Sequence, residues 1–363
     1  MTQRNDTQNN VIEPSAAEFH EMDDTAKALC FESMARRALR EWGMEEAELQ
    51  LIKQRENAVF SVRDSAGTRF ALRIHRAGYH SDAELVSELR WMSALNDFGV
   101  QTPAVIPALD GDLFKSVSTP ELPQPCQVDL LAWVSGQAIG SIEDTVGDIE
   151  SAAQNYHLVG QLVARMHQFT SQWSLPAGFV RHAWDEEGLL GATPWWGRYW
   201  ELEALNEDQR ELLHKTSKQA RAELEVYGKD PDRYGLIHAD PLPENFLRGD
   251  DGDIRVIDFD DGGFGWLMFD FATALFFHLG EPCFDRLLAA MMAGYQEVRE
   301  LPPEFEQKLP LFLLLRGLTY LGWAHTRKDT DTAREQTPIL VECVTALAAD
   351  YLVVPGTLPT TEI

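Results

Sequence analysis

Residues 238–261, HADPLPENFLRGDDGDIRVIDFDD, hold the side chains whose types and spacing point most directly to chemistry. Asp240 precedes Asn245 by five positions, and Asp258 lies thirteen positions further on. Phosphoryl transfer needs a carboxylate that orients or deprotonates the attacking hydroxyl, and hard oxygen ligands that hold Mg²⁺ against the phosphates. A single Asp or Asn in a loop is more often a turn residue. The three side chains together supply the groups that phosphoryl transfer requires.

These side chains need short strands around a loop to bring them together. Strands are predicted at three apolar runs, residues 236–237, 246–247 and 254–257, with a DDGD turn before the last. Asp240 and Asn245 then stand at the two ends of one tight loop, and the following hairpin returns Asp258 beside them. Pro241 and Pro243 each fix φ and remove an N–H, which predicts a rigid loop.

The segment HADPLPEN, followed by DFD, resembles the aminoglycoside phosphotransferase and choline kinase family, in which H-x-D-x-x-x-x-N precedes D-x-D. The resemblance implies an α+β, bilobal protein-kinase-like fold. Its N-terminal lobe would be small, with an antiparallel sheet and one helix, and its C-terminal lobe would be larger and mainly helical. It also implies an ATP- and Mg²⁺-dependent phosphotransferase.

The resemblance gives each matching position a role. Asp240 would be the catalytic base, and His238 would brace the loop. Asn245 and Asp258 would hold Mg²⁺. Asp260 stays open between assisting the metal, facing the substrate and being a solvated carboxylate.

The predicted N-terminal lobe carries a second group of candidate residues, for nucleotide binding. Alternation of apolar residues over 49–74 predicts a β-hairpin, and apolar residues at helical spacing between Ser81 and Gly99 predict a helix. By resemblance, Arg73 occupies the strand position of a kinase lysine, and Glu88 in the helix would pair with it. This is a departure, because a planar guanidinium is not equivalent to a lysine ammonium. An ordinary surface ion pair is the alternative.

Other nucleotide contacts are less specific. Asn57 lies where a phosphate-covering turn is expected, but no G-x-G-x-x-G or Walker A loop is present. The segment LAWV, residues 131–134, resembles the interlobe segment whose backbone binds adenine, which makes Ala132 and Val134 candidates. A Ser/Thr protein kinase of the stress-response type and a nucleotide-binding pseudokinase stay as alternatives to a small-molecule kinase. The sequence has no G-x-S-x-G elbow for a serine hydrolase.

The chain is predicted to divide into three parts, a flexible polar tail at 1–24, a nucleotide-binding lobe at 25–134 and a catalytic and substrate lobe at 135–363. Apolar residues from Leu158 to Phe169 predict a long amphipathic helix, and the chain beyond Met268 is predicted to be mostly helical. The apolar run 309–323 is broken by Arg316 and is too short for a bilayer, so a buried helix is expected.

Composition limits the partners. The 31 basic and 58 acidic residues give a formal charge of −27, which should repel nucleic acid and anionic membranes and favour cationic substrates. The four cysteines are far apart, and the N-terminal stretch lacks the apolar core of a secretory signal. We therefore expect a cytoplasmic protein without disulfides, zinc or a transmembrane segment.

Four short segments indicate which class of substrate to expect: ALRIHRAGYHS, SELRWM, LLGATPWWGRYWE and RGLTYLGWAHTR. They resemble homoserine kinase-type and hydroxylysine kinase-type enzymes, which implies a small cationic or zwitterionic substrate, an amino alcohol or a hydroxy amino acid. Asp261 and Glu201 could meet its amine, and Trp196, Trp266 or Trp323 could offer cation–π contact. Core packing is the alternative for each tryptophan.

Overall fold

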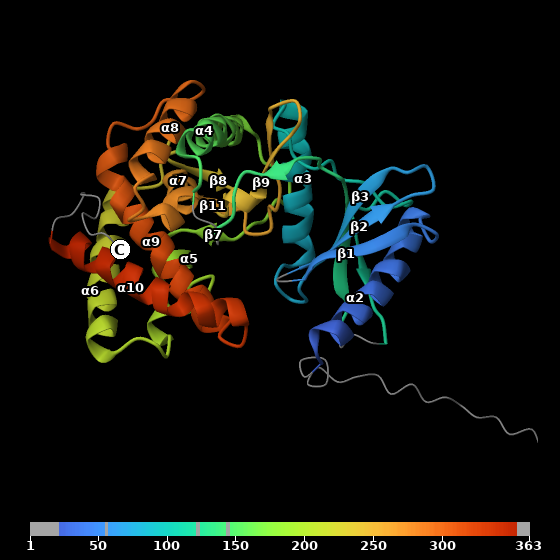
Figure 1. Cartoon of the computed structure of the whole chain (residues 1–363), viewed down its shortest axis with the longest axis horizontal. Helices are drawn as coiled ribbons and strands as arrows, with labels where there is room; N and C mark the ends of the chain where they lie inside the picture. Colours follow the sequence, from blue (N-terminus) through green and yellow to red (C-terminus); the bar gives the residue numbers. More distant parts are fainter. Residues whose placement is uncertain (1–21, 55–56, 121–123, 143–145, 354–363) are drawn as a thin grey trace, which may run out of the picture. The chain divides into compact units, whose positions relative to one another are not determined.

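The computed structural model describes residues 22–54, 57–120, 124–142 and 146–353, which form two compact units (Figure 1). The N-terminal unit comprises the described residues up to Ser93 together with Pro103–Val134, and the C-terminal unit comprises Ala94–Thr102 and the described residues from Ser135 onward. Of the predicted tail, residues 1–21 lie outside the described residues. The predicted α+β fold is confirmed, because an antiparallel sheet forms the first unit and helices dominate the second.

A five-stranded antiparallel sheet builds the N-terminal unit, in the order β1-β2-β3-β5-β4. The strands are β1 (Glu48–Gln54), β2 (Ala58–Arg63), β3 (Arg69–Ile74), β4 (Phe114–Val117) and β5 (Cys126–Ala132). The predicted hairpin is β2–β3. Asp64 shapes its turn by accepting the N–H groups of Ala66 and Thr68, and Gly67 takes a φ of 85°.

Two helices accompany this sheet, where one was predicted. The additional helix, α2 (Asp24–Ala38), continues into a 3₁₀ turn, η1 (Leu39–Trp42), and packs on the sheet. Its buried stripe contains Cys30, Met34 and Ala35, which are small or flexible side chains with a weak periodic signal. The expectation of a single helix was therefore wrong.

The predicted helix is α3 (Asp82–Phe98). Ser81 and Glu84 form a reciprocal cap, because the Ser81 N–H donates to Glu84 Oε2 at 2.9 Å and the Glu84 N–H donates to Ser81 Oγ at 3.3 Å. Gly99, with a φ of 95°, ends the helix as expected. The division between the two units falls inside α3, after Ser93.

Two three-stranded sheets in the C-terminal unit support the predicted catalytic loop, residues 238–245. One has the order β10 (Ile254–Val256), β9 (Phe246–Arg248), β6 (Gln137–Ala138). The other has the order β7 (Ala183–Trp184), β11 (Gly263–Trp266), β8 (Tyr234–Ile237). The antiparallel pairing of β9 with β10 confirms the predicted hairpin.

Helices make up most of the C-terminal unit. They are α4 (Ile149–Gln172), α5 (Glu186–Leu190), α6 (Glu207–Tyr227), α7 (Met268–Leu275), α8 (Phe284–Gln296), α9 (Phe305–Thr326) and α10 (Asp331–Val353), with 3₁₀ turns η2 (Tyr199–Glu201), η3 (Pro243–Asn245) and η4 (Phe276–His278). Figure 1 shows α4 beside α8. Gly160 permits this approach, because a Cβ there would lie 2.1 Å from the Met291 carbonyl oxygen.

The apolar run with Arg316 is in α9, and every residue of that helix from Leu309 to Gly322 is buried, as predicted. Its neighbour α10 is the one helix among the described residues that is long and apolar enough to cross a membrane. It packs against α9 and α6 and buries Leu340, Val344 and Leu347. Length and composition of this kind also suit a packing helix of a globular protein, so they are weak evidence for a membrane span.

Candidate active site

The catalytic loop leaves β8 at Ile237 and ends in the 3₁₀ turn η3. Pro243 is the first residue of that turn, where its missing N–H costs no hydrogen bond. The Asn245 side-chain amide donates to the Asp240 backbone oxygen at 2.9 Å and to Asp240 Oδ2 at 3.0 Å. The structure therefore brings Asp240 and Asn245 together across one short loop.

The hairpin of β9 and β10 delivers Asp258 to the same loop. Ile257, directly before it, donates its N–H to the Asn245 carbonyl oxygen at 2.9 Å, and its own carbonyl oxygen accepts from His238 Nε2 at 3.1 Å. The Asp240 N–H donates to His238 Nδ1 at 3.3 Å. His238 thus braces the loop through backbone contacts on both sides, and Asp258 stands one residue beyond them, exposed to solvent.

Two residues at this site have left-handed backbone conformations. Ala239 has a φ of 64° and Asp258 a φ of 66°, and neither is glycine. Such conformations cost free energy in a residue with a side chain, and they persist when neighbouring contacts hold them. Each therefore points to contacts that hold its segment.

Asp270, at the first turn of α7, holds Ala239. Its side chain is fully buried, and its Oδ1 accepts the Ala239 N–H at 2.8 Å while its Oδ2 accepts the His238 N–H at 3.1 Å. His167 of α4 donates from Nε2 to the same Oδ2 at 2.9 Å. Asp270 and His167 were not predicted from the sequence, because each lies in an otherwise apolar helical pattern that indicates packing.

His167 is neutral in this setting. Burial lowers its pKa below the ordinary value of 6.5, and the opposing influence of Asp270 does not reverse that effect. The Tyr295 hydroxyl lies 3.0 Å from Nδ1 and donates to it when Nε2 carries the proton. A neutral imidazole therefore links Tyr295 of α8 to the carboxylate that holds the catalytic loop.

Arg181 holds the segment that follows Asp258. It is buried, and its guanidinium donates to the carbonyl oxygens of Gly262 at 2.5 Å, Asp260 at 2.5 Å and Phe259 at 3.3 Å. Three donors from one planar group fix the path of this turn. The Asp260 side chain is itself buried, which excludes a solvated carboxylate there.

Arg316 of α9 contacts Asp240 directly. It is fully buried and donates from Nη2 to Asp240 Oδ1 at 2.9 Å and from Nη1 to the Ala239 carbonyl oxygen at 3.2 Å. The ring of Trp196 lies 4.7 Å from its guanidinium carbon, and that of Tyr320 lies 4.2 Å away. The Asp240 side chain is 18% exposed, so one part of it still faces solvent.

In the N-terminal unit, the predicted pair of Arg73 and Glu88 is present with Nη1 and Oε1 3.0 Å apart. Asp129, directly opposite Arg73 on β5, was not foreseen and binds the same guanidinium at 3.0 Å from Nε and 2.7 Å from Nη2. His75 Nε2 lies 2.7 Å from Asp129 Oδ2. Burial would raise the pKa of Asp129, but Arg73 and His75 outweigh it and hold that pKa at about 2.

The remaining nucleotide candidates lie in the same unit. Asn57 accepts the Arg76 N–H at 3.1 Å through Oδ1. The Ala132 N–H donates to Ala104 at 2.8 Å, so it is engaged within the unit. The Ala132 N–H is therefore already bonded within the chain, and contact of Ala132 or Val134 with nucleotide stays a prediction.

The tryptophans considered for cation–π contact already face cations of the chain. Arg327 lies 5.7 Å from the Trp196 ring and 5.8 Å from the Trp323 ring, in addition to Arg316 over Trp196. Trp266 is fully buried and donates to the Gly228 carbonyl oxygen, which fits the packing alternative. Carboxylates are therefore better candidates than these rings for meeting a substrate amine.

The acidic candidates differ in setting. Asp261 is half-buried, and its Oδ1 accepts from Trp196 Nε1 at 3.2 Å. Glu201 pairs with Arg198 at 3.0 Å and lies 3.7 Å from His325. The ring of Trp196, which donates to Asp261, also lies 4.7 Å from the guanidinium carbon of Arg316. Asp261 and the arginine that contacts Asp240 thus share one neighbouring side chain.

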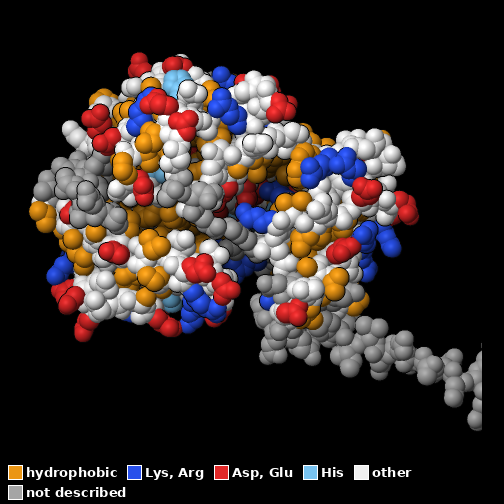
Figure 2. Space-filling view, in the orientation of Figure 1, with side chains coloured by type: hydrophobic (Ala, Val, Ile, Leu, Met, Phe, Trp, Pro, Cys, Tyr) orange, Lys and Arg blue, Asp and Glu red, His pale blue; other side chains and the backbone are white. Residues whose placement is uncertain are grey.

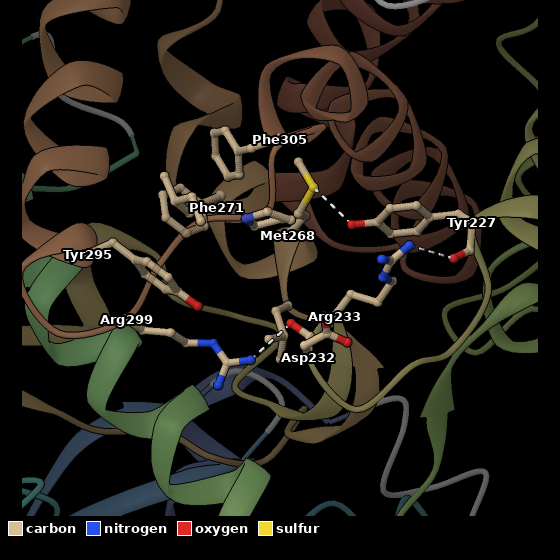
Figure 3. A pocket seen from close by; sticks show the side chains of 11 residues that line it. Tyr227, Asp232, Arg233, Met268, Phe271, Tyr295, Arg299 and Phe305 are labelled. Carbon is tan, nitrogen blue, oxygen red and sulfur yellow. Dashed lines mark hydrogen bonds between the residues drawn. The ribbon is translucent and has the colours of Figure 1, made fainter.

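A small cavity lies beside α7, lined by Met268, Phe271, Tyr295 and Arg299 among others (Figure 3). Its volume of about 10 Å³ has room for one water molecule. Figure 3 shows Arg299 donating to the Asp232 carbonyl oxygen at its rim. This cavity is too small for a substrate. It is a gap between side chains that pack against α7, the helix that carries Asp270.

Replacing Asp129 tests the buried cluster of Arg73, Glu88, Asp129 and His75. We expect Asp129→Asn to lower the free energy of unfolding by about 3 kcal/mol at pH 7, because it leaves a buried guanidinium without its bidentate partner. The contribution of the Asp129 charge should be complete above about pH 3.8 and be lost as the pH falls toward 2. Urea unfolding followed by tryptophan fluorescence measures both.

Asp112→Asn is the matched control, because Asp112 forms an exposed ion pair with Lys115. It should change the free energy of unfolding by less than about 0.5 kcal/mol. Equal effects of the two substitutions would contradict the importance assigned to Asp129.

The neutral His167 predicts a pH dependence. Because the unfolded chain binds this proton more readily, the free energy of unfolding should fall as the pH drops below about 6.5. His167→Gln should reduce that slope by at most about 1.4 kcal/mol per pH unit. Melting temperatures from pH 7.5 to pH 5.5 measure the slope, with exposed His214→Gln as control. Identical slopes for His167→Gln and the unchanged protein would refute a neutral buried His167.

Comparison with known proteins identifies relatives of this chain. The model of the phosphotransferase enzyme family matches residues 48–306. A solved microcompartment-associated aminopropanol kinase is 34% identical, with a TM-score of 0.79 over 91% of this chain and 100% of that one. Amicoumacin kinase of Bacillus subtilis is 26% identical over 325 residues, which are 86% of this chain and 90% of that protein.

A solved amicoumacin kinase in complex with AMP-PNP and Ca²⁺ shares the fold, with 21% identity and a TM-score of 0.73 over 93% of this chain and 98% of that one. The family match covers well over half of the chain and includes the whole catalytic loop. The chain therefore belongs to the phosphotransferase enzyme family and is a small-molecule kinase, a phosphotransferase with an alcohol group as acceptor.

Proposed function

We propose that this kinase transfers the γ-phosphate of ATP, in the presence of Mg²⁺, to the hydroxyl group of a small amino alcohol. The observation that carries the proposal is the Asp240 carboxylate, whose two oxygens are fixed by Asn245 and Arg316. A carboxylate held in this way can accept a hydrogen bond from an alcohol in one defined orientation.

The donor set fits Mg²⁺. Asn245 uses its amide nitrogen on Asp240, so its amide oxygen is the atom that can meet a cation, and exposed Asp258 adds a carboxylate. Mg²⁺ is commonly bound by one or two protein oxygens together with phosphate oxygens and water. A bound Mg²⁺ would neutralise negative charge on the phosphates. The solved amicoumacin kinase with AMP-PNP and Ca²⁺ supports a nucleotide with a divalent cation.

The chain's own residues have defined tasks in the transfer. Asp240 accepts a hydrogen bond from the alcohol, whose oxygen attacks the γ-phosphorus as the bond from that phosphorus to the bridging oxygen of ADP breaks. Asp240 then takes the alcohol proton. His238, Asp270 and Arg181 hold the loop segments in place. We assign phosphate contact in the N-terminal unit to Arg73, oriented by Glu88 and Asp129.

Charge favours an amine without a carboxylate as the substrate. Asp258, Asp260 and Asp261 lie within four residues of one another, whereas Arg181 is engaged by backbone oxygens and Arg316 by Asp240. On the face shown in Figure 2, acidic and basic side chains are interspersed over the C-terminal unit. Asp258 is assigned to Mg²⁺ and Asp260 is buried, so an ammonium group is favoured beside the half-buried Asp261 carboxylate, and the carboxylate of a hydroxy amino acid is disfavoured there. The similarity to an aminopropanol kinase supports the same class.

The first test replaces the proposed base. Asp240→Asn should lower kcat at least about 100-fold with aminopropanol as acceptor, because the amide cannot take the proton. ADP release in a coupled assay measures kcat, and Asp250→Asn in the exposed turn of the same hairpin should leave it unchanged. Near-normal activity of Asp240→Asn would refute the mechanism. Labelling of protein substrates in place of small alcohols would favour a Ser/Thr kinase.

The second test concerns Asp261. Asp261→Asn should raise KM for aminopropanol about 10-fold, because it removes a carboxylate that meets the ammonium, and should leave KM for ATP within twofold. Steady-state kinetics with aminopropanol, ethanolamine and homoserine measure the effect. A preference of the unchanged enzyme for homoserine over both amino alcohols would contradict the assignment of the substrate class.

A further inference from the structure

Arg316 is a fully buried cation in the apolar helix α9, and apolar packing does not explain why an arginine occupies this position. It interrupts an apolar helix, and burying an unpaired guanidinium there would be strongly unfavourable. Its partners are the Tyr320 hydroxyl at 2.9 Å, the Ala239 carbonyl oxygen and Asp240 Oδ1. Two of these three acceptors belong to the catalytic loop.

The contacts to Asp240 come from two sides. Arg316 Nη2 donates to Oδ1, and Asn245 Nδ2 donates to Oδ2. One donor on each oxygen fixes the plane of the carboxylate, and each oxygen keeps further lone-pair capacity for a substrate hydroxyl. Arg316 therefore restricts the rotation of the Asp240 side chain.

The same guanidinium holds the strained residue before Asp240. The Ala239 carbonyl oxygen accepts from Arg316 Nη1 at 3.2 Å and from the Thr273 hydroxyl at 3.3 Å, while the Ala239 N–H is held by Asp270. Both ends of the left-handed residue are thus bonded. Through the Ala239 carbonyl oxygen, Arg316 of α9 therefore helps to set the direction in which the Asp240 side chain leaves the backbone.

The guanidinium itself is fixed by aromatic rings. Its carbon lies 4.7 Å from the Trp196 ring, 4.2 Å from that of Tyr320 and 5.5 Å from that of Phe269. Cation–π contacts stabilise the charge, and the close-packed rings leave it little freedom. A rigid support is what a catalytic group needs in order to hold a productive geometry.

We propose that Arg316 is the positioning residue for Asp240, and that it sets the turnover rate by fixing the carboxylate that receives the alcohol proton. The inference rests on the proposed function. Because Arg316 is fully buried, we assign it an action through Asp240 and no direct contact with ATP or with the acceptor.

Arg316→Lys and Arg316→Met test the proposal. We expect kcat with aminopropanol to fall about 10-fold in Arg316→Lys and about 100-fold or more in Arg316→Met, with KM for ATP and for aminopropanol within about threefold. An ammonium keeps the charge but cannot reach both Asp240 and Ala239 in the planar arrangement. If Arg316→Met does not fold, Arg316→Lys carries the comparison, since it keeps the cation.

Arg210→Lys is the matched control. Arg210 of α6 donates to the backbone oxygens of Leu202 and Leu205. Like Arg316 it holds backbone carbonyl groups, but these groups lie outside the catalytic loop. Its kcat should stay within twofold of the unchanged enzyme. A loss in Arg210→Lys equal to that in Arg316→Lys would overturn the proposal.

A double substitution separates positioning from general structural support. If Arg316 acts through Asp240, adding Arg316→Lys to Asp240→Asn should lower the residual kcat by less than twofold. A further 10-fold loss in the double variant would show that Arg316 acts independently of Asp240. Normal kcat in Arg316→Lys beside an inactive Asp240→Asn would overturn only the role of Arg316. An active Asp240→Asn would overturn the proposed function itself.

Discussion

The proposed active site depends on one buried carboxylate, that of Asp270. It accepts the two successive backbone N–H groups of His238 and Ala239 and the Nε2–H of His167. Buried backbone donors must be satisfied, and at a left-handed residue no regular strand or helix partner is available. Because Asp270 of α7 bonds the N–H of left-handed Ala239, α7 helps to set the direction in which the next side chain, Asp240, leaves the backbone.

A second constraint comes from arginines that are committed to carbonyl oxygens. Arg181 fixes the backbone after Asp258, and Arg316 fixes the backbone before Asp240. Each offers several donors in one plane, so a single side chain can hold several peptide groups that would otherwise lie unpaired. In a chain with a formal charge of −27, these two buried arginines thus hold the backbone of the loop segments.

The sequence was most informative where the chemistry is local. Asp240, Asn245 and Asp258 fall within nineteen residues, so one loop and one hairpin decide their arrangement, and turn and strand patterns predict both. Asp270, Arg181 and Arg316 contact the same loop segments from 31 to 81 positions away in the chain. A polar residue in an apolar helix signals only that a buried partner exists. Which partner it meets is decided by how the helices pack, and spacing along the sequence does not contain that information.

Asp129 accompanies the replacement of the kinase lysine by Arg73 on β3. A lysine on β3 could satisfy Glu88 with a single ammonium, but a guanidinium buried at the same place has more donors to satisfy. The register of the sheet sets Asp129 of β5 directly opposite Arg73, where Nε and Nη2 meet both carboxylate oxygens and Nη1 still reaches Glu88. The arginine and the aspartate are therefore one structural unit. Exchanging Arg73 alone for lysine would leave Asp129 buried without its bidentate partner, so a return to the lysine of other kinases requires that both strands change together.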